Sequence, residues 1–286
     1  MQLFIGAVVN MLFLSSMYIL VALGFALLFS IMELLHVAHG VIYMVSGYIC
    51  SFFLTKLGLN QWLAFLLTVL IVSCFGPFLE RFCFRPFFRD FDKMLLVGVA
   101  ISAIVQTTVV LAKGYQFEAL PPFVTGIIKW GPITVSLERL VTFLIGGALL
   151  LVLVLFINKS KIGLQMQAVA QDLEGALLQG IDVHRVSAIA CVIACGLAAV
   201  AGGLMGAYLG LGAFMGDYVF TKCLILVVLG GIGSMSGLFL AGLIIGALDA
   251  FLPIFLSGSA TEALSMGILI CILLLRPRGL LGRELA

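Results

Sequence analysis

Long apolar runs alternate with short polar segments along almost the whole chain. A membrane-spanning helix needs about 20 mainly apolar residues, because it rises about 1.5 Å per residue across a hydrocarbon core about 30 Å thick. The apolar runs of this chain fall at about 4–32, 37–55, 61–79, 94–112, 140–157, 186–211, 218–232, 238–256 and 261–275. This pattern predicts an all-α polytopic membrane protein, a bundle of eight or nine transmembrane helices that forms a single transmembrane domain over residues 1–286.

Two places decide between eight and nine spans. The first run is unusually long, which fits a span followed by a dip into the membrane. The runs at 218–232 and 238–256 are separated by the glycine-rich stretch Gly230–Gly237, so one of them is a candidate half-helix. Small residues also recur at a spacing of four, in Gly202-x-x-x-Gly206-x-x-x-Gly210 and Gly242-x-x-x-Gly246, and this spacing lets helices approach closely in lipid.

The composition excludes several classes of protein. The chain is 63% hydrophobic and 10% charged, with a mean hydropathy of +1.29, whereas soluble domains carry roughly a quarter charged residues. No basic cluster with interleaved aromatics is present, which argues against nucleic-acid binding. Seven scattered cysteines, an odd number, argue against a disulfide framework. No phosphate-binding loop, catalytic triad or close carboxylate pair stands out, so we expect no enzyme activity in this chain.

The distribution of Lys and Arg predicts the orientation, because cytoplasmic loops carry an excess of these residues. Ten lie on one side of the predicted spans, namely Arg81, Arg85, Arg89, Lys93, Lys159, Lys161, Arg185, Arg276, Arg278 and Arg283. The other side has four, namely Lys56, Lys113, Lys129 and Arg139. This places residues 80–93, 158–185 and the C-terminus in the cytoplasm. With nine spans the N-terminus lies outside, which its uncharged start favours, and with eight it lies inside.

A polar segment at about 158–185 interrupts two long apolar runs. Within it, Ala168, Asp172, Ala176 and Gly180 trace a helix of about three turns, which Gly180 is placed to end in the left-handed conformation. The side chains with which this helix would face water are those of Gln171, Asp172, Glu174 and Gln179. Both a solvated interfacial helix and a helix that docks onto a partner protein fit these residues.

On the opposite side, an external excursion covers about 113–139. Alternating residues in Ile127–Trp130 and Ile133–Val135 flank Gly131-Pro132, which predicts a small β-hairpin. Such a hairpin could contact an external partner or be a plain surface loop.

Ionisable residues near or within the apolar runs are functional candidates, because a charge in the membrane is expensive. These residues are Glu33, His36, His39, Asp217, Lys222, Asp249 and Glu262. His36 and His39 would share a helix face at a junction exposed to headgroups or cytoplasm, and a metal site there would need more ligands. Asp217 and Lys222 could cap a helix or pair locally. Asp249, near the middle of its run, suits either a helix-to-helix hydrogen bond or a substrate contact.

Six segments in order resemble one known family. They are Asn10 with Tyr18-Ile-Leu-Val-Ala-Leu-Gly24; Ala38-His39-Gly40 with Tyr43-Met44; Glu80-Arg81 with Arg85-Pro86; Ala168-Val-Ala-Gln-Asp172 through Gly180-Ile181; Val228-Leu-Gly-Gly-Ile-Gly-Ser234; and Arg276-Pro277 with Gly279-Leu-Leu-Gly282. The chain resembles the permease subunits of bacterial branched-chain amino acid ABC importers, particularly the shorter, high-affinity type, and the resemblance runs nearly end to end.

The resemblance implies the partners and location of the chain. It implies a second permease subunit in a heterodimer, two cytoplasmic ATPase subunits and a periplasmic substrate-binding protein, in the lipid bilayer of a bacterial inner membrane. ATP and Mg²⁺ are used by the ATPases, and no cofactor is bound by this chain. The polar segment becomes a coupling helix whose ATPase contacts are Ala168, Gln171, Asp172, Glu174, Gly180 and Ile181. Candidates for the translocation path are Asn10, Tyr18, His36, His39, Tyr43, Lys222 and Asp249.

The function implied is ATP-driven uptake of a small amino acid, such as leucine, isoleucine or valine, by alternating access. Two departures leave the substrate open to an amide, urea or a small organic acid. His36 stands where the family usually has Asn, and Gly212–Asp217 replaces an asparagine-proline turn. A different class, an ion-coupled secondary transporter, would use Asp249 or Glu33 for the coupling ion, and a purely structural membrane scaffold is a third interpretation.

Overall fold

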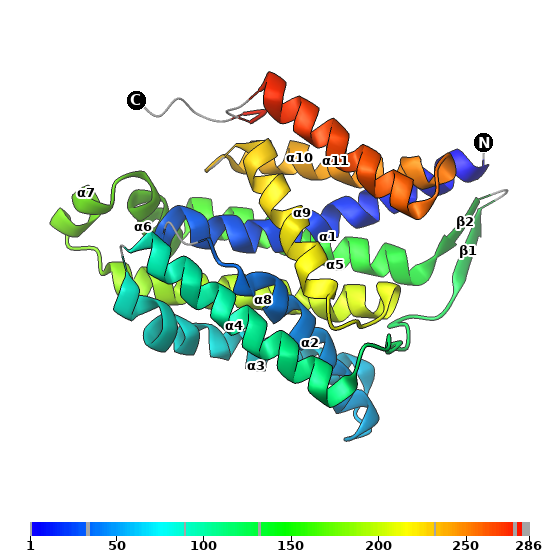
Figure 1. Ribbon diagram of the computed structural model, residues 1–286, viewed down its shortest axis with the longest axis horizontal. Coiled ribbons are helices and arrows are strands. Elements are labelled where there is room, and N and C mark those ends of the chain that lie inside the picture. The colour runs from blue at the N-terminus through cyan, green and yellow to red at the C-terminus, as the bar shows by residue number, and fades with distance from the viewer. Residues whose placement is uncertain are drawn as a thin grey trace. The chain divides into compact units, whose positions relative to one another are not determined.

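The computed structural model describes residues 2–32, 35–88, 90–130, 133–231, 233–276 and 279–281. Several residues that entered the predictions lie outside this part of the chain, namely Glu33, Arg89, Gly131, Pro132, Ile232, Pro277, Arg278, Gly282 and Arg283. The helices are α1 (Gln2–Met32), α2 (Ala38–Thr55), α3 (Gln61–Leu79), α4 (Phe91–Lys113), α5 (Leu137–Lys159), α6 (Lys161–Gln171), α7 (Leu173–Leu178), α8 (Val183–Leu209), α9 (Met215–Gly230), α10 (Met235–Phe251) and α11 (Gly258–Leu275) (Figure 1).

The helices confirm an all-α polytopic membrane protein. Within the described residues, seven helical stretches are long and apolar enough to span a membrane: Phe4–Met32, Ala38–Thr55, Gln61–Phe87, Phe91–Lys113, Leu137–Lys159, Val183–Leu209 and Met235–Ile254. Helix α9 has 16 residues and rises only about 24 Å. The apolar part of α11, Ala260–Leu275, is also short. The count of eight or nine spans therefore stays a prediction. Helix α1 is continuous over 31 residues, so the dip suggested by its length is not a separate element.

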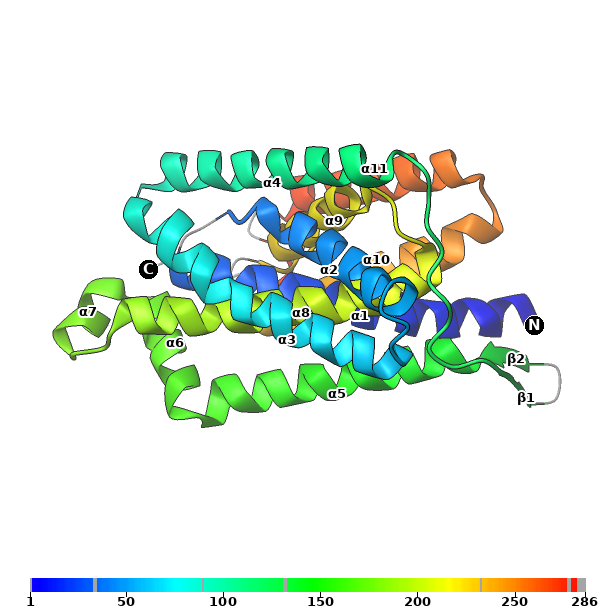
Figure 2. The same cartoon turned by 90° about the horizontal axis from the view of Figure 1, so that it is seen from below.

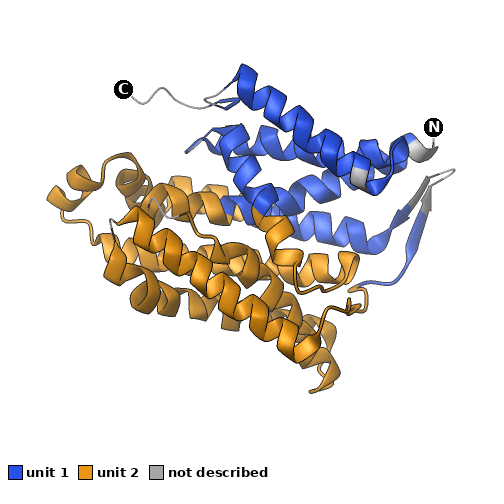
Figure 3. Cartoon of the chain, in the orientation of Figure 1, with its two compact units in different colours: residues 1–23, 124–149, 221–286 blue, residues 24–123, 150–220 orange. Residues whose placement is uncertain are grey.

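The chain forms two compact units of packing (Figure 3). Unit 1 contains residues 1–23, 124–149 and 221–286, and unit 2 contains residues 24–123 and 150–220. Three of the four boundaries fall inside helices α1, α5 and α9, and the fourth lies between residues 123 and 124 in the segment before β1. The single domain expected from the sequence stays a prediction.

Helices α2, α3 and α8 pack side by side in unit 2 (Figures 1 and 2). Glycines allow this close approach. A β-carbon added to Gly202 of α8 would collide with the carbonyl oxygen of Tyr43 and the hydroxyl of Ser46 on α2, and one added to Gly76 of α3 would lie 2.6 Å from the carbonyl oxygen of Cys191. In lipid, such backbone contact is a main source of helix association.

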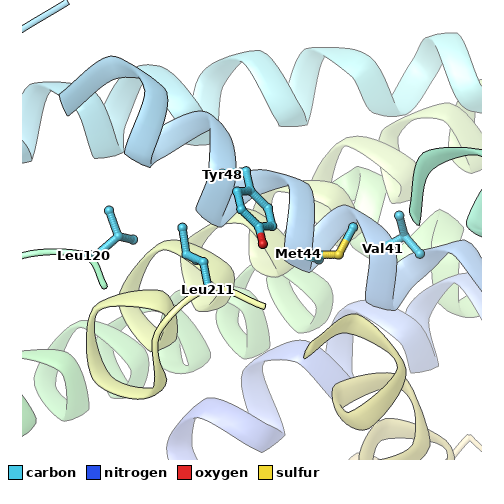
Figure 4. Packing of buried hydrophobic residues seen from close by; sticks show 5 residues of the cluster. All are labelled: Val41, Met44, Tyr48, Leu120 and Leu211. Carbon is cyan, nitrogen blue, oxygen red and sulfur yellow. The ribbon is translucent and has the colours of Figure 1, made fainter. Parts of the chain in front are cut away.

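One face of α2 carries a second part of the unit 2 core. Val41, Met44 and Tyr48 recur at helical spacing and pack with Leu120 and Leu211 from two connecting segments (Figure 4). A backbone bridge fixes these segments together, because the amides of Glu118 and Leu211 each donate to the other's carbonyl, at 2.9 and 2.7 Å. The Glu118 carboxylate also accepts hydrogen bonds from Ser51 and Lys113, at 2.6 and 2.9 Å.

The hairpin expected in the external excursion is confirmed within unit 1. Strands β1 (Ile127–Trp130) and β2 (Ile133–Ser136) are antiparallel, with Ile127 opposite Ser136 and Trp130 opposite Ile133. The amide of Leu137 donates to the carbonyl of Gly126 at 3.0 Å and closes the base of the hairpin. Helix α5 begins directly after β2.

The glycine contact of α8 can be tested by adding a single methyl group. We expect Gly202→Ala to lower the free energy of unfolding by about 1–3 kcal/mol, because the methyl group overpacks the contact with α2. Gly147→Ala on α5 is a matched control, since a β-carbon there meets no atom within 4 Å and alanine is the better helix former. Thermal unfolding in detergent measures both. Equal melting temperatures for the two variants would contradict this packing.

Candidate functional site

The polar segment, residues 158–185, forms two helices rather than one. The predicted single helix of three turns across residues 168–180 is wrong, because the chain breaks at Asp172, whose backbone is extended at φ −153° and ψ 104°. The amide of Asp172 still donates to the carbonyl of Ala168 at 3.0 Å and ends α6. Its carboxylate accepts from the amide of Gly175 at 3.0 Å and begins α7. An aspartate favours this capping position over a helix interior.

The end of α7 follows the prediction for Gly180. Gly180 has φ 76°, its amide donates to the carbonyl of Leu177 at 3.0 Å, and the amide of Ile181 donates to the carbonyl of Ala176 at 3.1 Å. These two bonds make the Schellman motif that ends many helices. Asp182 then caps α8 by accepting from the amide of Arg185 at 3.1 Å. Short-range hydrogen bonds therefore determine the shape of the polar segment.

The surface of the segment is partly apolar. Gln171, Asp172, Glu174 and Gly180, all predicted partner contacts, are exposed, whereas Ala168 and Ile181 are half-buried. Leu178 is 88% exposed, and Leu177 and Leu164 are also exposed. Sequence reasoning did not single out Leu178, although its place in the last turn of a short helix inside a polar segment was a usable signal.

Beneath the segment lie two hollows that share the side chains of Phe88 and Leu173. One, of about 300 Å³, is also lined by Leu177, Ile181, Asp182, Val183 and His184. The other, of about 170 Å³, is lined by the end of α1, the start of α4 and residues 169–171. The rings of Phe88 and His184 meet edge to face with centroids 5.5 Å apart. Phe88 is thus a direct contact between the polar segment and the turn before α4.

His36 and His39 are buried, so the prediction of an exposed junction is wrong. Their side chains are 1% and 0% exposed, and their ring centroids are 5.8 Å apart. The ring of Phe84 meets His36 edge to face at 5.0 Å. Burial, with a smaller contribution from the nearby His39, lowers the pKa of His36 to about 3. Among the described residues no three His, Cys, Asp or Glu side chains form a group that could hold a metal ion.

A second candidate site lies in unit 1, where three of the predicted path residues meet. Lys222 Nζ on α9 lies 2.9 and 2.8 Å from the two carboxylate oxygens of Asp249 on α10. The hydroxyl of Tyr18 on α1 donates to Asp249 Oδ2 at 2.9 Å, and Lys222 Nζ lies 5.9 Å from the centre of the Tyr18 ring. The Lys222 and Asp249 side chains are 2% and 11% exposed.

The structure gives the partners of the charges that the sequence singled out. Asp249 makes the helix-to-helix contact that was one alternative. Asp217 accepts a hydrogen bond from Gln106 at 2.6 Å, while the ion pair of Lys222 is with Asp249 rather than local. Of the remaining path candidates, Tyr43 is buried on α2 and Asn10 is half-buried on α1.

The burial of His36 predicts a pH dependence of stability. Because the pKa of the folded state lies below the ordinary value of about 6.5, the unfolded chain takes up a proton that the folded chain does not, and stability falls as pH drops below 6.5. We expect His36→Asn to remove about 2 kcal/mol of this loss between pH 7 and pH 5. Thermal unfolding across that range measures it, and identical slopes for the two proteins would contradict the buried neutral imidazole.

Comparisons with known proteins give the family. The model of the family described as "Branched-chain amino acid transport system / permease component" matches residues 7–274. The high-affinity branched-chain amino acid transport system permease protein LivH of Escherichia coli is 32% identical, over 98% of this chain and 96% of the relative. The corresponding protein BraD of Pseudomonas aeruginosa is 31% identical over the same shares. A probable LivH of Methanocaldococcus jannaschii is 22% identical over 94% of this chain and 89% of the relative.

No solved structure matches the chain. The family match covers all but the first six and last twelve residues, and the relatives correspond to the chain over nearly their whole length. The seven apolar helices of spanning length found among the described residues agree with a multi-pass membrane protein. This chain belongs to the permease components of branched-chain amino acid transport systems.

Proposed function

We propose that this chain is the membrane-spanning subunit of an ATP-driven importer that moves a branched-chain amino acid from the periplasm to the cytoplasm. The observation that carries the proposal is the match to the permease family over residues 7–274, joined by relatives that are named high-affinity branched-chain amino acid permeases. The substrate is leucine, isoleucine or valine, delivered by a periplasmic binding protein.

The polar segment is the docking site for the ATPase in this proposal. It projects at one end of unit 2 (Figures 1 and 3), and Leu178 exposes 88% of its surface there. Covering an exposed leucine with an apolar groove stabilises the complex by roughly 25 cal/mol per Å² of apolar surface buried. Glu174 and Gln171 add polar contacts at the rim. ATP and Mg²⁺ remain in the two ATPase subunits, and this chain hydrolyses nothing.

The transport cycle then works by alternating access. A second permease chain completes the pathway, and closure of the ATPases moves α7 and with it the contact of Phe88 and His184. That contact passes the motion to the turn before α4. A conformational change of this kind needs partner contacts that differ between the two states, and ATP-dependent closure supplies the difference.

The orientation follows the charge of the loops. The Lys and Arg excess places the polar segment and the C-terminus in the cytoplasm. The chain accordingly lies in the inner membrane of a bacterium, where a periplasmic binding protein reaches the opposite side.

Reconstitution tests the function directly. The chain is purified with its co-purifying subunits, placed in liposomes and supplied with binding protein and ATP. We expect accumulation of radiolabelled leucine that depends on ATP and is indifferent to ion gradients, because the energy enters through the ATPases. Uptake that follows a sodium or proton gradient without ATP would instead establish the secondary transporter.

A single surface substitution tests the docking site. We expect Leu178→Glu to reduce both ATPase co-purification and leucine uptake at least tenfold, because it places a charge in an apolar interface. The free energy of unfolding should stay unchanged, since the side chain is exposed. The matched control is Leu57→Glu, at a leucine that is 55% exposed between α2 and α3. This variant should retain both ATPase co-purification and leucine uptake. Wild-type uptake by Leu178→Glu would refute the assignment.

Asp172 is a poorer test position than Leu178. Its carboxylate caps α7, and losing such a cap costs about 1 kcal/mol. A charge reversal there would mix a local folding defect with any loss of the ATPase contact.

A further inference from the structure

Three helices of unit 1 meet at Asp249 because glycines let α10 lie against α1. A β-carbon on Gly242 would collide with Ile19, and one on Gly246 would collide with the hydroxyl of Ser15. Asp249 follows Gly246 by one helical turn, so its side chain points to the same neighbour, where Tyr18 donates to it. Lys222 reaches it from α9.

Stabilisation of the fold alone does not explain the resulting ion pair. Removing two charges from water costs several kcal/mol each, and an apolar pair of the same size is often neutral or stabilising. Lys222 is nevertheless 1% exposed within a helix of the bundle. By contrast, the ion pairs of Lys93 with Asp90 and of Lys113 with Glu118 are substantially exposed. Charges buried in a membrane protein are functional candidates by default.

We infer that the Lys222–Asp249 pair, with Tyr18, is a binding site for the zwitterionic head group of an amino acid. The inference rests on the proposed function for the class of substrate. An α-amino acid carries one ammonium and one carboxylate group, which are the counterparts of Asp249 and Lys222. When the pair separates, the carboxylate of Asp249 receives the substrate ammonium group, and the ammonium of Lys222 receives the substrate carboxylate.

Exchanging the Lys222–Asp249 pair for two pairs with the substrate keeps the charges of the substrate partnered during transport. A zwitterion that enters a medium of low dielectric must find a partner for each of its charges, or pay a large desolvation cost. In the occupied site, two ion pairs with the substrate replace the single Lys222–Asp249 pair. In the empty site, Lys222 and Asp249 pair with each other. Neither the empty nor the occupied site therefore leaves a buried charge unpaired.

Two hydroxyl groups near the pair add polar contacts. Tyr18 is already a donor to Asp249. Ser15 is 1% exposed, and its hydroxyl has no hydrogen-bond partner in the described part of the chain. Buried hydroxyls are normally satisfied. Ser15 lies one turn from Tyr18 on α1 and against Gly246, which is one turn from Asp249, so a head group held at the pair would have this hydroxyl nearby.

The test compares variants in liposomes that contain the assembled transporter, binding protein and ATP. Leucine uptake is measured together with the ATPase activity stimulated by leucine-loaded binding protein. We expect Asp249→Asn, Lys222→Met and the apolar double variant Lys222→Met with Asp249→Leu to lose at least tenfold in uptake. The stimulated ATPase activity should stay within twofold of wild type, because docking and coupling do not need the head-group site.

Controls separate this inference from its rivals. Lys113→Met removes the exposed partner of Glu118 and should leave uptake intact. Near-normal uptake by the apolar double variant would overturn the inference, since the pair would then be structural. Loss of stimulated ATPase activity together with uptake in a folded complex would also overturn it, in favour of a role in coupling. If the double variant does not assemble, the swap Lys222→Asp with Asp249→Lys replaces it, and failure of both identifies the pair as an assembly element.

The result for the unmodified protein keeps the two proposals apart. Wild-type liposomes that hydrolyse ATP but accumulate no leucine would refute the proposed function. Wild-type liposomes that accumulate leucine, with variants that do so equally well, would refute only the head-group site.

Discussion

Close contact between helix backbones is the interaction on which the rest of this structure depends. In a membrane the hydrophobic effect gives helices little reason to associate, so van der Waals packing and interhelical polar contacts must hold the bundle. Gly202 and Gly76 bring α8 and α3 against their neighbours in unit 2. Gly242 and Gly246 do the same for α10 and α1 in unit 1. The buried polar groups are then placed where these close contacts occur.

The two candidate sites differ in how they are stabilised. The polar segment is shaped by local hydrogen bonds, with caps at Asp172 and Asp182 and a left-handed glycine at 180. The segment exposes Leu164, Leu177 and Leu178. The Lys222–Asp249 pair is instead formed between helices α9 and α10, is joined by Tyr18 from the distant helix α1, and is enclosed by the protein. A protein that couples an external energy source to passage of a small polar molecule needs both an open surface and a closed polar site.

Local patterns predicted much of the fold. Apolar periodicity indicated the helices, the alternation around residues 131–132 indicated the β1–β2 hairpin, and Gly180 indicated the end of α7. One error arose where two local signals competed, and another where tertiary packing overrode a local signal. At Asp172 the helical spacing of apolar residues suggested continuity, while the carboxylate forms an N-cap and breaks the helix. His36 and His39 were expected at an exposed junction because they lie where two apolar runs meet. Packing against Phe84 and the neighbouring helices buries them.

The sequence by itself determined the class of the protein, the positions of most helices and, through the spacing of conspicuous residues, its family. These features depend on interactions within a few turns of the chain or on composition. Only the tertiary structure decided that Lys222 pairs with Asp249, and that Tyr18, more than 200 positions away, joins them. No local pattern encodes a contact between helices so distant in sequence. It arises because the glycines of α10 set the distance at which these side chains can meet.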